Sequence, residues 1–156
     1  MVMVMFKLAS AALLLLGSVA LAAAAAPQCL APHEIEAEQA IRFQAELMVV
    51  SDTCGAQTYT QFARRNRTTL VDYQQQVIDR FRRDGTAHAE AKFDSYLTRL
   101  ANEVSLRTGA QPVAAMCRDA ASFLATAESL VGGDEFRRYI AQQAATHRAD
   151  YRRCSN

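Results

Sequence analysis

The chain has 156 residues, with 17 Lys and Arg against 16 Asp and Glu, four Cys and no Trp. A net charge of +1 gives the protein no strong positive field, which argues against a nucleic-acid or polyanion binder.

The first 26 residues differ in kind from the rest. Lys7 is followed by an apolar run from Leu8 and by an alanine tract that ends at Ala26. An early cation, an apolar run and small residues at the exit are typical of a secretory signal peptide, with cleavage predicted between Ala24 and Ala26. Loss of Lys7 leaves 16 basic and 16 acidic residues. The sequence therefore predicts an exported protein, periplasmic or secreted, whose mature chain is neutral and forms a single helical domain over residues 27–156.

The mature chain is expected to be helical throughout. Gly is scarce, Pro falls only at positions 27, 32 and 112, and no stretch alternates apolar and polar residues for long. No later apolar run approaches the ~20 residues of a membrane-spanning helix. Predicted helices cover residues 32 to about 51–55, 57–83, 86–108, 112–131 and 134–151. We expect them to form an all-α, four- to five-helix up-and-down bundle with two disulfides.

Local signals mark the ends of these helices. Pro32 suits a first helical turn, and Gly109 follows the cleanest amphipathic stripe in the chain, within residues 86–108. A kink or break is expected near Asn66, where Thr68 or Thr69 could cap a new helix. The last helix is predicted to have Asp134 as its N-cap.

Four cysteines in an exported chain indicate two disulfides, for which three pairings exist. Cys29 and Cys54 flank a predicted helix about 30 Å long, whereas bridged Cα atoms lie within about 7 Å, so that pairing is the least favoured. We favour Cys54 with Cys117, and Cys29 with Cys154 as a tie between the termini; Cys29 with Cys117 and Cys54 with Cys154 stays open. The cysteine positions require at least one irregular connection in the bundle.

Two sets of polar residues are candidates for a ligand or partner surface. Arginine clusters, among them Arg64 and Arg65, could bind an anionic partner, although cations at helix C-termini also complement the helix dipole. Thr98, Asn102 and Ser105 form a polar edge beside the apolar stripe of residues 86–108. They could line a ligand cleft. We favour the alternative that they form ordinary hydrogen bonds across a helix–helix seam.

No recognisable catalytic, cofactor or metal motif is found in the sequence. The three His are dispersed, His147 is expected to be partly buried on the last helix, and no Glu-x-x-His pair, C-x-x-C-H or H-E-x-x-H motif is present. Only Glu103, Asp119 and Glu128 lie beside predicted inward positions, so no carboxylate pair is singled out for hydrolysis. The prediction leans against an enzyme and against a cofactor. Asn66-Arg67-Thr68 also matches an N-glycosylation sequon.

Three segments carry a resemblance to a known group of proteins. They are Leu47-Met48-Val49-Val50 to Cys54, Tyr59-x-x-Phe62-x-Arg64-Arg65, and Asp94-x-Tyr96-x-x-x-Leu100-Ala101-Asn102-x-x-Ser105. Together they resemble small exported bacterial proteins with four cysteines. The resemblance implies a periplasmic or secreted helical protein, and it implies no activity, ligand or catalytic residue.

These observations lead to three ranked expectations. The first is a non-enzymatic interaction, accessory or chaperone-like protein with a protein partner in the cell envelope. The second is a small-ligand or lipid-binding helical bundle, with the site between helices. The third is a cell-wall hydrolase.

Overall fold

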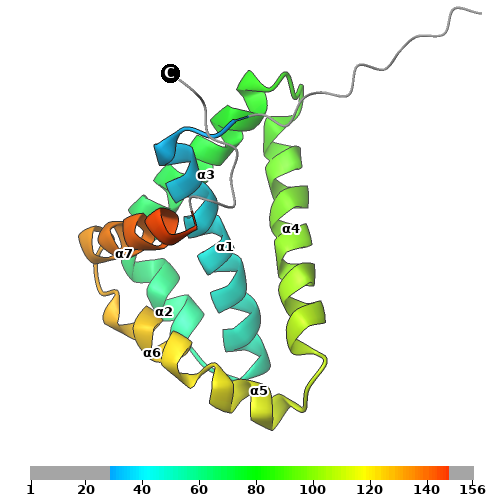
Figure 1. The fold of residues 1–156 in the computed structure, drawn as a ribbon, viewed down its shortest axis with the longest axis vertical. Helices are drawn as coiled ribbons and strands as arrows, with labels where there is room; N and C mark the ends of the chain where they lie inside the picture. The colour runs from blue at the N-terminus through cyan, green and yellow to red at the C-terminus, as the bar shows by residue number, and fades with distance from the viewer. Residues whose placement is uncertain (1–28, 148–156) are drawn as a thin grey trace, which may run out of the picture.

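The computed structural model describes residues 29–147, and this part of the chain contains seven helices (Figure 1). They are α1 (Pro32–Thr53), α2 (Thr58–Arg65), α3 (Arg67–Arg83), α4 (Ala89–Thr108), α5 (Val113–Asp119), α6 (Ala121–Ser129) and α7 (Gly133–Thr146). The all-α prediction is confirmed. The four- to five-helix up-and-down bundle is wrong, because two predicted helices are split and the helices are not arranged side by side.

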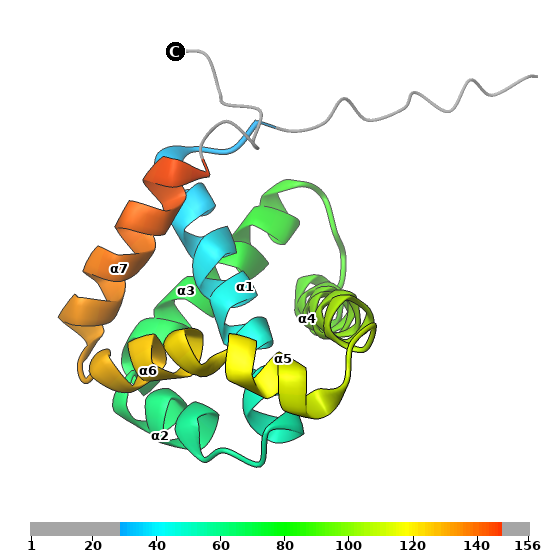
Figure 2. The same ribbon diagram turned by 60° about the horizontal axis from the view of Figure 1, so that its bottom comes forward.

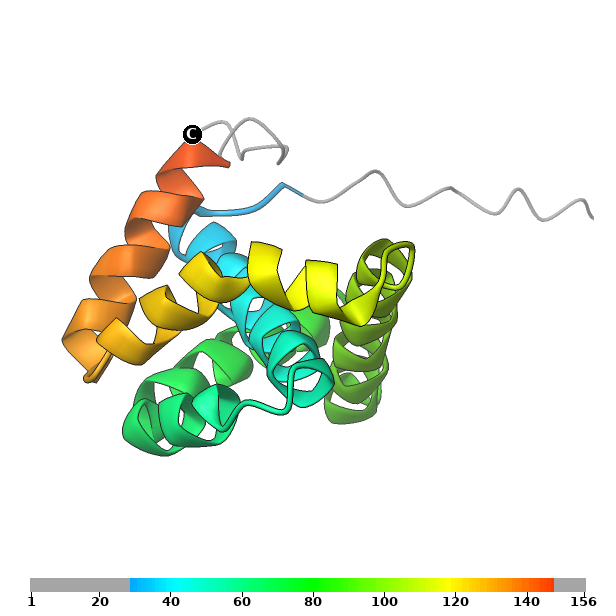
Figure 3. The ribbon, with the colours of Figure 1, turned by 90° about the horizontal axis from the view of Figure 1, so that it is seen from below.

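Helix α1 lies at the centre of the fold and contacts each of the other six helices. Figures 2 and 3 show these helices arranged around it. The cause is its composition, because small or apolar residues occupy all sides of α1 and Ala37, Ala40, Ile41, Ala45 and Leu47 are fully buried. A helix with buried side chains on every side needs neighbouring helices on every side. An up-and-down bundle would have left one side of α1 in water.

The predicted break near Asn66 is confirmed, with α2 ending at Arg65 and α3 beginning at Arg67. Asn66 is 1% exposed, and its Nδ2 donates hydrogen bonds to the carbonyl oxygens of Phe62 at 3.2 Å and Leu130 at 2.9 Å. The predicted caps are wrong, because Thr68 and Thr69 lie inside α3. The break depends instead on a bond from Asn66 to the end of α6.

The predicted helix over residues 112–131 is wrong at Ala120, where α5 ends and α6 begins. Helix α5 is bonded to the end of α1 through Cys117, whereas α6 packs on α2, so the chain must turn between them. Alanine favours a helix, so the local sequence carries no signal for this turn. Helix α7 begins at Gly133 with Gly132 as N-cap, so the predicted Asp134 cap is also wrong.

The predicted Cys54–Cys117 disulfide is confirmed, with the two Cα atoms 5.7 Å apart. Cys54 directly follows α1, and α5 crosses at this end of the helix (Figure 1). It is the one disulfide within residues 29–147, where the fold prediction had two for the whole chain. Cys154, the predicted partner of Cys29, and the signal peptide of residues 1–26 lie outside the described residues, so the Cys29–Cys154 pairing and the signal peptide stay predictions.

Aromatic side chains fill the core between α1, α2 and α7. The rings of Phe62 and Phe136 meet edge to face at 4.9 Å between centroids, and Phe43 of α1 packs against both. Such contacts stabilise beyond the buried area alone. Within the described residues no helix is long and apolar enough to span a membrane.

Candidate ligand-binding cleft

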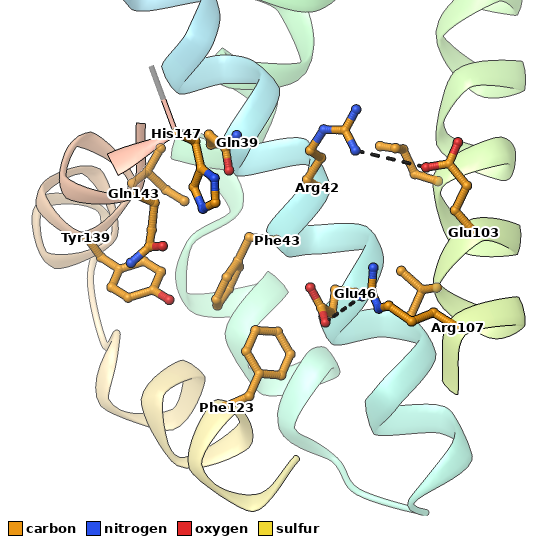
Figure 4. A pocket seen from close by; sticks show the side chains of 13 residues that line it. Gln39, Arg42, Phe43, Glu46, Glu103, Arg107, Phe123, Tyr139, Gln143 and His147 are labelled. Atoms are coloured by element: carbon orange, nitrogen blue, oxygen red, sulfur yellow. Dashed lines mark hydrogen bonds and ion pairs between the residues drawn. The ribbon is translucent and has the colours of Figure 1, made fainter. Parts of the chain in front are cut away.

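An open cleft of about 570 Å³ lies between α4 and α7, with α1 as its floor and α6 at one end (Figure 4). We call it the α4–α7 cleft. Its side chains come from regularly spaced helix positions, because residues at i, i+3, i+4 and i+7 share one face of a helix. The lining residues are Gln39, Arg42, Phe43 and Glu46 of α1, Leu100, Glu103, Val104 and Arg107 of α4, Phe123 of α6, and Tyr139, Ile140, Gln143 and His147 at α7.

One wall of the cleft is aromatic. The ring of Phe43 lies 5.2 Å from that of Phe123 and 5.4 Å from that of Tyr139, both edge to face. Burial and the nearby carboxylate of Glu46 raise the pKa of Tyr139, so its hydroxyl stays protonated at neutral pH. This wall therefore offers apolar ring surface together with one neutral hydroxyl.

The opposite wall is charged and bridges α1 to α4. Arg42 Nη1 lies 4.0 Å from Glu103 Oε2, and Arg107 Nη2 donates to Glu46 Oε1 at 2.8 Å (Figure 4). These four side chains are between 41% and 61% exposed. Ion pairs with this exposure contribute little stability. The wall carries two positive and two negative charges, so it is neutral overall.

A buried polar network beneath the cleft holds one of these arginines. Glu38 is 5% exposed, and it accepts hydrogen bonds from Arg42 Nε and Arg80 Nη2, both at 3.1 Å, and from the Tyr96 hydroxyl. Burial, followed by the charge of Glu38 and the hydrogen bond to it, raises the pKa of Tyr96 far above its usual range. Tyr96 is therefore a neutral donor. The network fixes the Nε side of the Arg42 guanidinium at the edge of the cleft.

A second buried carboxylate lies one turn earlier on α1. Glu34 accepts a hydrogen bond from the backbone N–H of Ala31 at 2.8 Å and is ion-paired with Arg83. Burial by itself would raise the pKa of Glu34, but the Ala31 hydrogen bond and the Arg83 guanidinium lower it below its ordinary value. Glu34 thus joins the start of α1 to the end of α3.

The predicted polar edge of α4 does not form a seam. Thr98, Asn102 and Ser105 are exposed, and the hydroxyls of Thr98 and Ser105 donate to carbonyls of their own helix at 2.9 Å. The prediction that these residues form hydrogen bonds across a helix–helix seam is therefore wrong for these two hydroxyls. Ser105 lines a second cleft, which also takes residues from the end of α1 and the start of α2, such as Met48 and Tyr59. Thr98 and Asn102 line neither cleft.

Arg64 and Arg65 lie at the end of α2, on the other side of α1 from α4 (Figure 3). The structure therefore does not bring them together with the polar edge of α4. Arg65 Nη2 donates to the carbonyl oxygen of Glu128 at 3.4 Å. Most other clustered arginines are paired with acids, which favours the structural interpretation of the clusters; these pairs are Arg80–Glu38, Arg82–Asp79, Arg83–Glu34, Arg137–Asp72 and Arg138–Glu135.

Sequence reasoning found only part of the α4–α7 cleft. Glu103 and His147 line it, whereas Asp119 and Glu128 are exposed elsewhere, and His147 is exposed rather than partly buried. Arg42 was missed. The available signal was the helical spacing i, i+3, i+4, i+7 of polar and apolar residues, which the cleft residues share in α1 and in α4.

No group of three or more His, Cys, Asp or Glu within residues 29–147 is arranged to hold a metal ion. No protein-family model, curated protein or solved structure matches the chain. The resemblance to exported four-cysteine proteins therefore stays a prediction.

Proposed function

We propose that this protein is a non-enzymatic binding protein that holds a small, partly apolar ligand in the α4–α7 cleft. One observation carries the proposal, namely that the cleft joins an aromatic wall to a wall of oriented charged groups. Its volume of about 570 Å³ is in the range of small-molecule sites, which combine apolar surface with a few placed polar groups. The second expectation from the sequence, a small-ligand binder, thus gains the most support.

The cleft is less suited to hydrolysis. Glycoside hydrolysis uses two carboxyl groups, one of which must hold a proton. Glu46 and Glu103 are the carboxylates that line the cleft, and each is ion-paired with an arginine. This arrangement is typical of structural pairs rather than of a proton donor.

A protein partner in the cell envelope has less support from the described surface. The exposed large apolar side chains there are 52% to 80% exposed and lie on different segments; they are Val71, Leu106, Val113 and Val131. Single exposed apolar residues are ordinary on protein surfaces and indicate no particular partner. Export remains part of the proposal, since the Cys54–Cys117 disulfide is typical of an oxidising compartment.

Two adjacent glutamines of α7 provide a matched test of the cleft. Gln143 lines the cleft and Gln142 does not, so Gln143→Trp fills the cleft whereas Gln142→Trp places the same side chain on the outside. We expect a fragment library, screened by ligand-observed NMR, to give hits with the unchanged chain and with Gln142→Trp that are lost with Gln143→Trp. Circular dichroism must show that both variants are folded. Hits retained by folded Gln143→Trp, or no hits with any of the three proteins, would refute the proposal.

A further inference from the structure

The second cleft, at the end of α1, differs from the α4–α7 cleft in its charge. Its volume is also about 570 Å³. Its lining residues are Met48, Val49, Ser51, Asp52 and Thr53 of α1, Ala56 and Gln57 between α1 and α2, Tyr59 and Thr60 of α2, and Ser105 of α4. Among these described residues Asp52 is the one that carries a charge. The second cleft is therefore negative, whereas the charged wall of the α4–α7 cleft is neutral.

The Asp52 carboxylate is available to a ligand. It is exposed, and its side chain forms no ion pair or hydrogen bond with the residues that the structure describes. The basic residues next to the lining positions of α2 and α4 are Arg64 and Arg107; neither lines the cleft, and Arg107 is paired with Glu46 at 2.8 Å. An ionised carboxylate only accepts hydrogen bonds, so the group that meets Asp52 must donate them. A positively charged donor makes the stronger bond.

The wall beside Asp52 is fixed by the corner between α1 and α2. The backbone N–H of Tyr59 donates to the hydroxyl of Ser51, which is 2% exposed, at 3.1 Å, and the Tyr59 hydroxyl accepts from Gln44 Nε2 at 3.5 Å. Tyr59 and Met48 are both half-buried, so they present an aromatic ring and a thioether to the cleft. Aromatic rings attract cations, and methionine adapts to apolar groups of varied shape.

We propose that the second cleft binds a small organic monocation, with an ammonium group on Asp52 and an apolar body against Met48, Val49 and Tyr59. A divalent metal ion fits this cleft less well, because Ca²⁺ takes several oxygen ligands and one carboxylate lines the cleft. The proposed function concerns the α4–α7 cleft, so the two proposals stand independently.

The probes are 4-phenylbutylamine, the neutral 4-phenylbutanol and 4-phenylbutyrate, titrated against the full mature chain by NMR at low salt. We expect the amine to bind roughly two- to fivefold more tightly than the alcohol, which is the effect of one exposed ion pair, and the butyrate to bind most weakly. Asp52→Asn should remove the preference for the amine and keep the affinity for the alcohol. Asp94→Asn is the matched control, because Asp94 is exposed on α4 and lines neither cleft. The preference should also shrink in about 0.5 M NaCl, which screens exposed charges.

Two adjacent residues of α4 locate the binding. Ser105 lines the second cleft, whereas Leu106 is 80% exposed and does not line it. Ser105→Trp should therefore abolish binding of the amine, and Leu106→Trp should keep it. Gln143→Trp should keep it as well, because Gln143 lines only the α4–α7 cleft. Circular dichroism must show that these variants are folded.

Several outcomes overturn the inference. They are no binding of the amine, equal binding of the amine and the alcohol, tighter binding of the butyrate, or a preference for the amine that survives Asp52→Asn. Amine binding that is lost in Gln143→Trp but kept in folded Ser105→Trp would place the ligand in the α4–α7 cleft. That result would overturn this inference and support the proposed function, so the two failures are distinguished.

Discussion

Replacing Glu38 with glutamine removes one negative charge from the buried network at almost constant shape. Glu38 and Arg80 are 5% and 9% exposed, so this substitution leaves the Arg80 guanidinium buried without a counter-charge. Removing one partner of a buried ion pair costs about 3–5 kcal/mol. The glutamine oxygen still accepts one hydrogen bond, for example from Tyr96, which places the expected loss near the lower end, about 3 kcal/mol. For a domain of this size the melting temperature should fall by roughly 10 °C.

Asp72→Asn is the matched control for Glu38→Gln. Asp72 is also ion-paired with an arginine, Arg137, at 2.6 Å, but these side chains are 48% and 43% exposed. Exposed pairs contribute about 0–1 kcal/mol, so this charge-removing change should leave stability nearly unchanged. The comparison separates the effect of burial from the loss of a carboxylate.

The assay is urea unfolding followed by far-UV circular dichroism, without reductant so that the Cys54–Cys117 disulfide stays intact. The free energy of unfolding in water comes from linear extrapolation, and equal slopes show that the variants expose similar surface on unfolding. A loss below about 1 kcal/mol for Glu38→Gln, or a loss equal to that of Asp72→Asn, would show that the network beneath the cleft does not stabilise the fold.

Three further predictions concern other parts of the fold. Replacing Cys54 and Cys117 together with serine should cost about 4 kcal/mol of unfolding free energy in urea, because the bond joins residues 63 apart in sequence; a loss below about 1 kcal/mol would contradict this. Asn66→Ala should cost about 1–3 kcal/mol in the same assay, since the carbonyl of Leu130 loses the side-chain donor, whereas the carbonyl of Phe62 keeps the backbone N–H of residue 66. The exposed control Asn102→Ala should change stability by less than about 0.5 kcal/mol; similar losses for the two would rule out the role of the buried side chain. The lowered pKa of Glu34 means that its contribution is present above the ordinary value of 4.5 and is lost as the pH falls below it. The stability difference between the unchanged chain and Glu34→Gln, measured by urea unfolding across this range, should therefore shrink at acid pH, and a difference independent of pH would contradict the prediction.

The buried Asn66 also bears on the sequon that it begins. Its Nδ2, the atom to which a glycan would be attached, donates to two backbone carbonyls in the core. A glycan on this nitrogen would be incompatible with both bonds and with 1% exposure. The Asn66-Arg67-Thr68 motif is therefore better explained by the corner between α2 and α3 than by modification.

Local sequence was sufficient where a helix is defined by its own stripe and end signals. The predicted helix over residues 86–108 corresponds to α4, Ala89–Thr108, because its apolar residues repeat with the helical period and Gly109 follows. The break at Asn66 was found because polar residues interrupt the apolar pattern there. The break at Ala120 was not found, because both flanking segments favour a helix and only the separate packing of α5 and α6 divides them.

The cleft is formed by residues that are far apart in sequence, and local sequence patterns do not predict which of them meet. Arg42 and Glu103 are 61 positions apart in sequence, and each belongs to an amphipathic pattern that could equally be a solvated helix face. Arg42 and Glu103 meet because α4 packs against α1, and the cleft forms because α4 and α7 lie on opposite sides of α1 (Figure 2).

The sequence by itself determined the helical class, most helix limits, the break at Asn66 and the favoured partner of Cys54, because these follow from apolar periodicity, end signals and helix length. Only the tertiary structure decided that α1 is central, that the chain turns at Ala120 and that a charged wall faces an aromatic wall. The physical reason is that periodicity shows which face of a helix seeks burial, whereas the choice of neighbour is made by the packing of all the faces together.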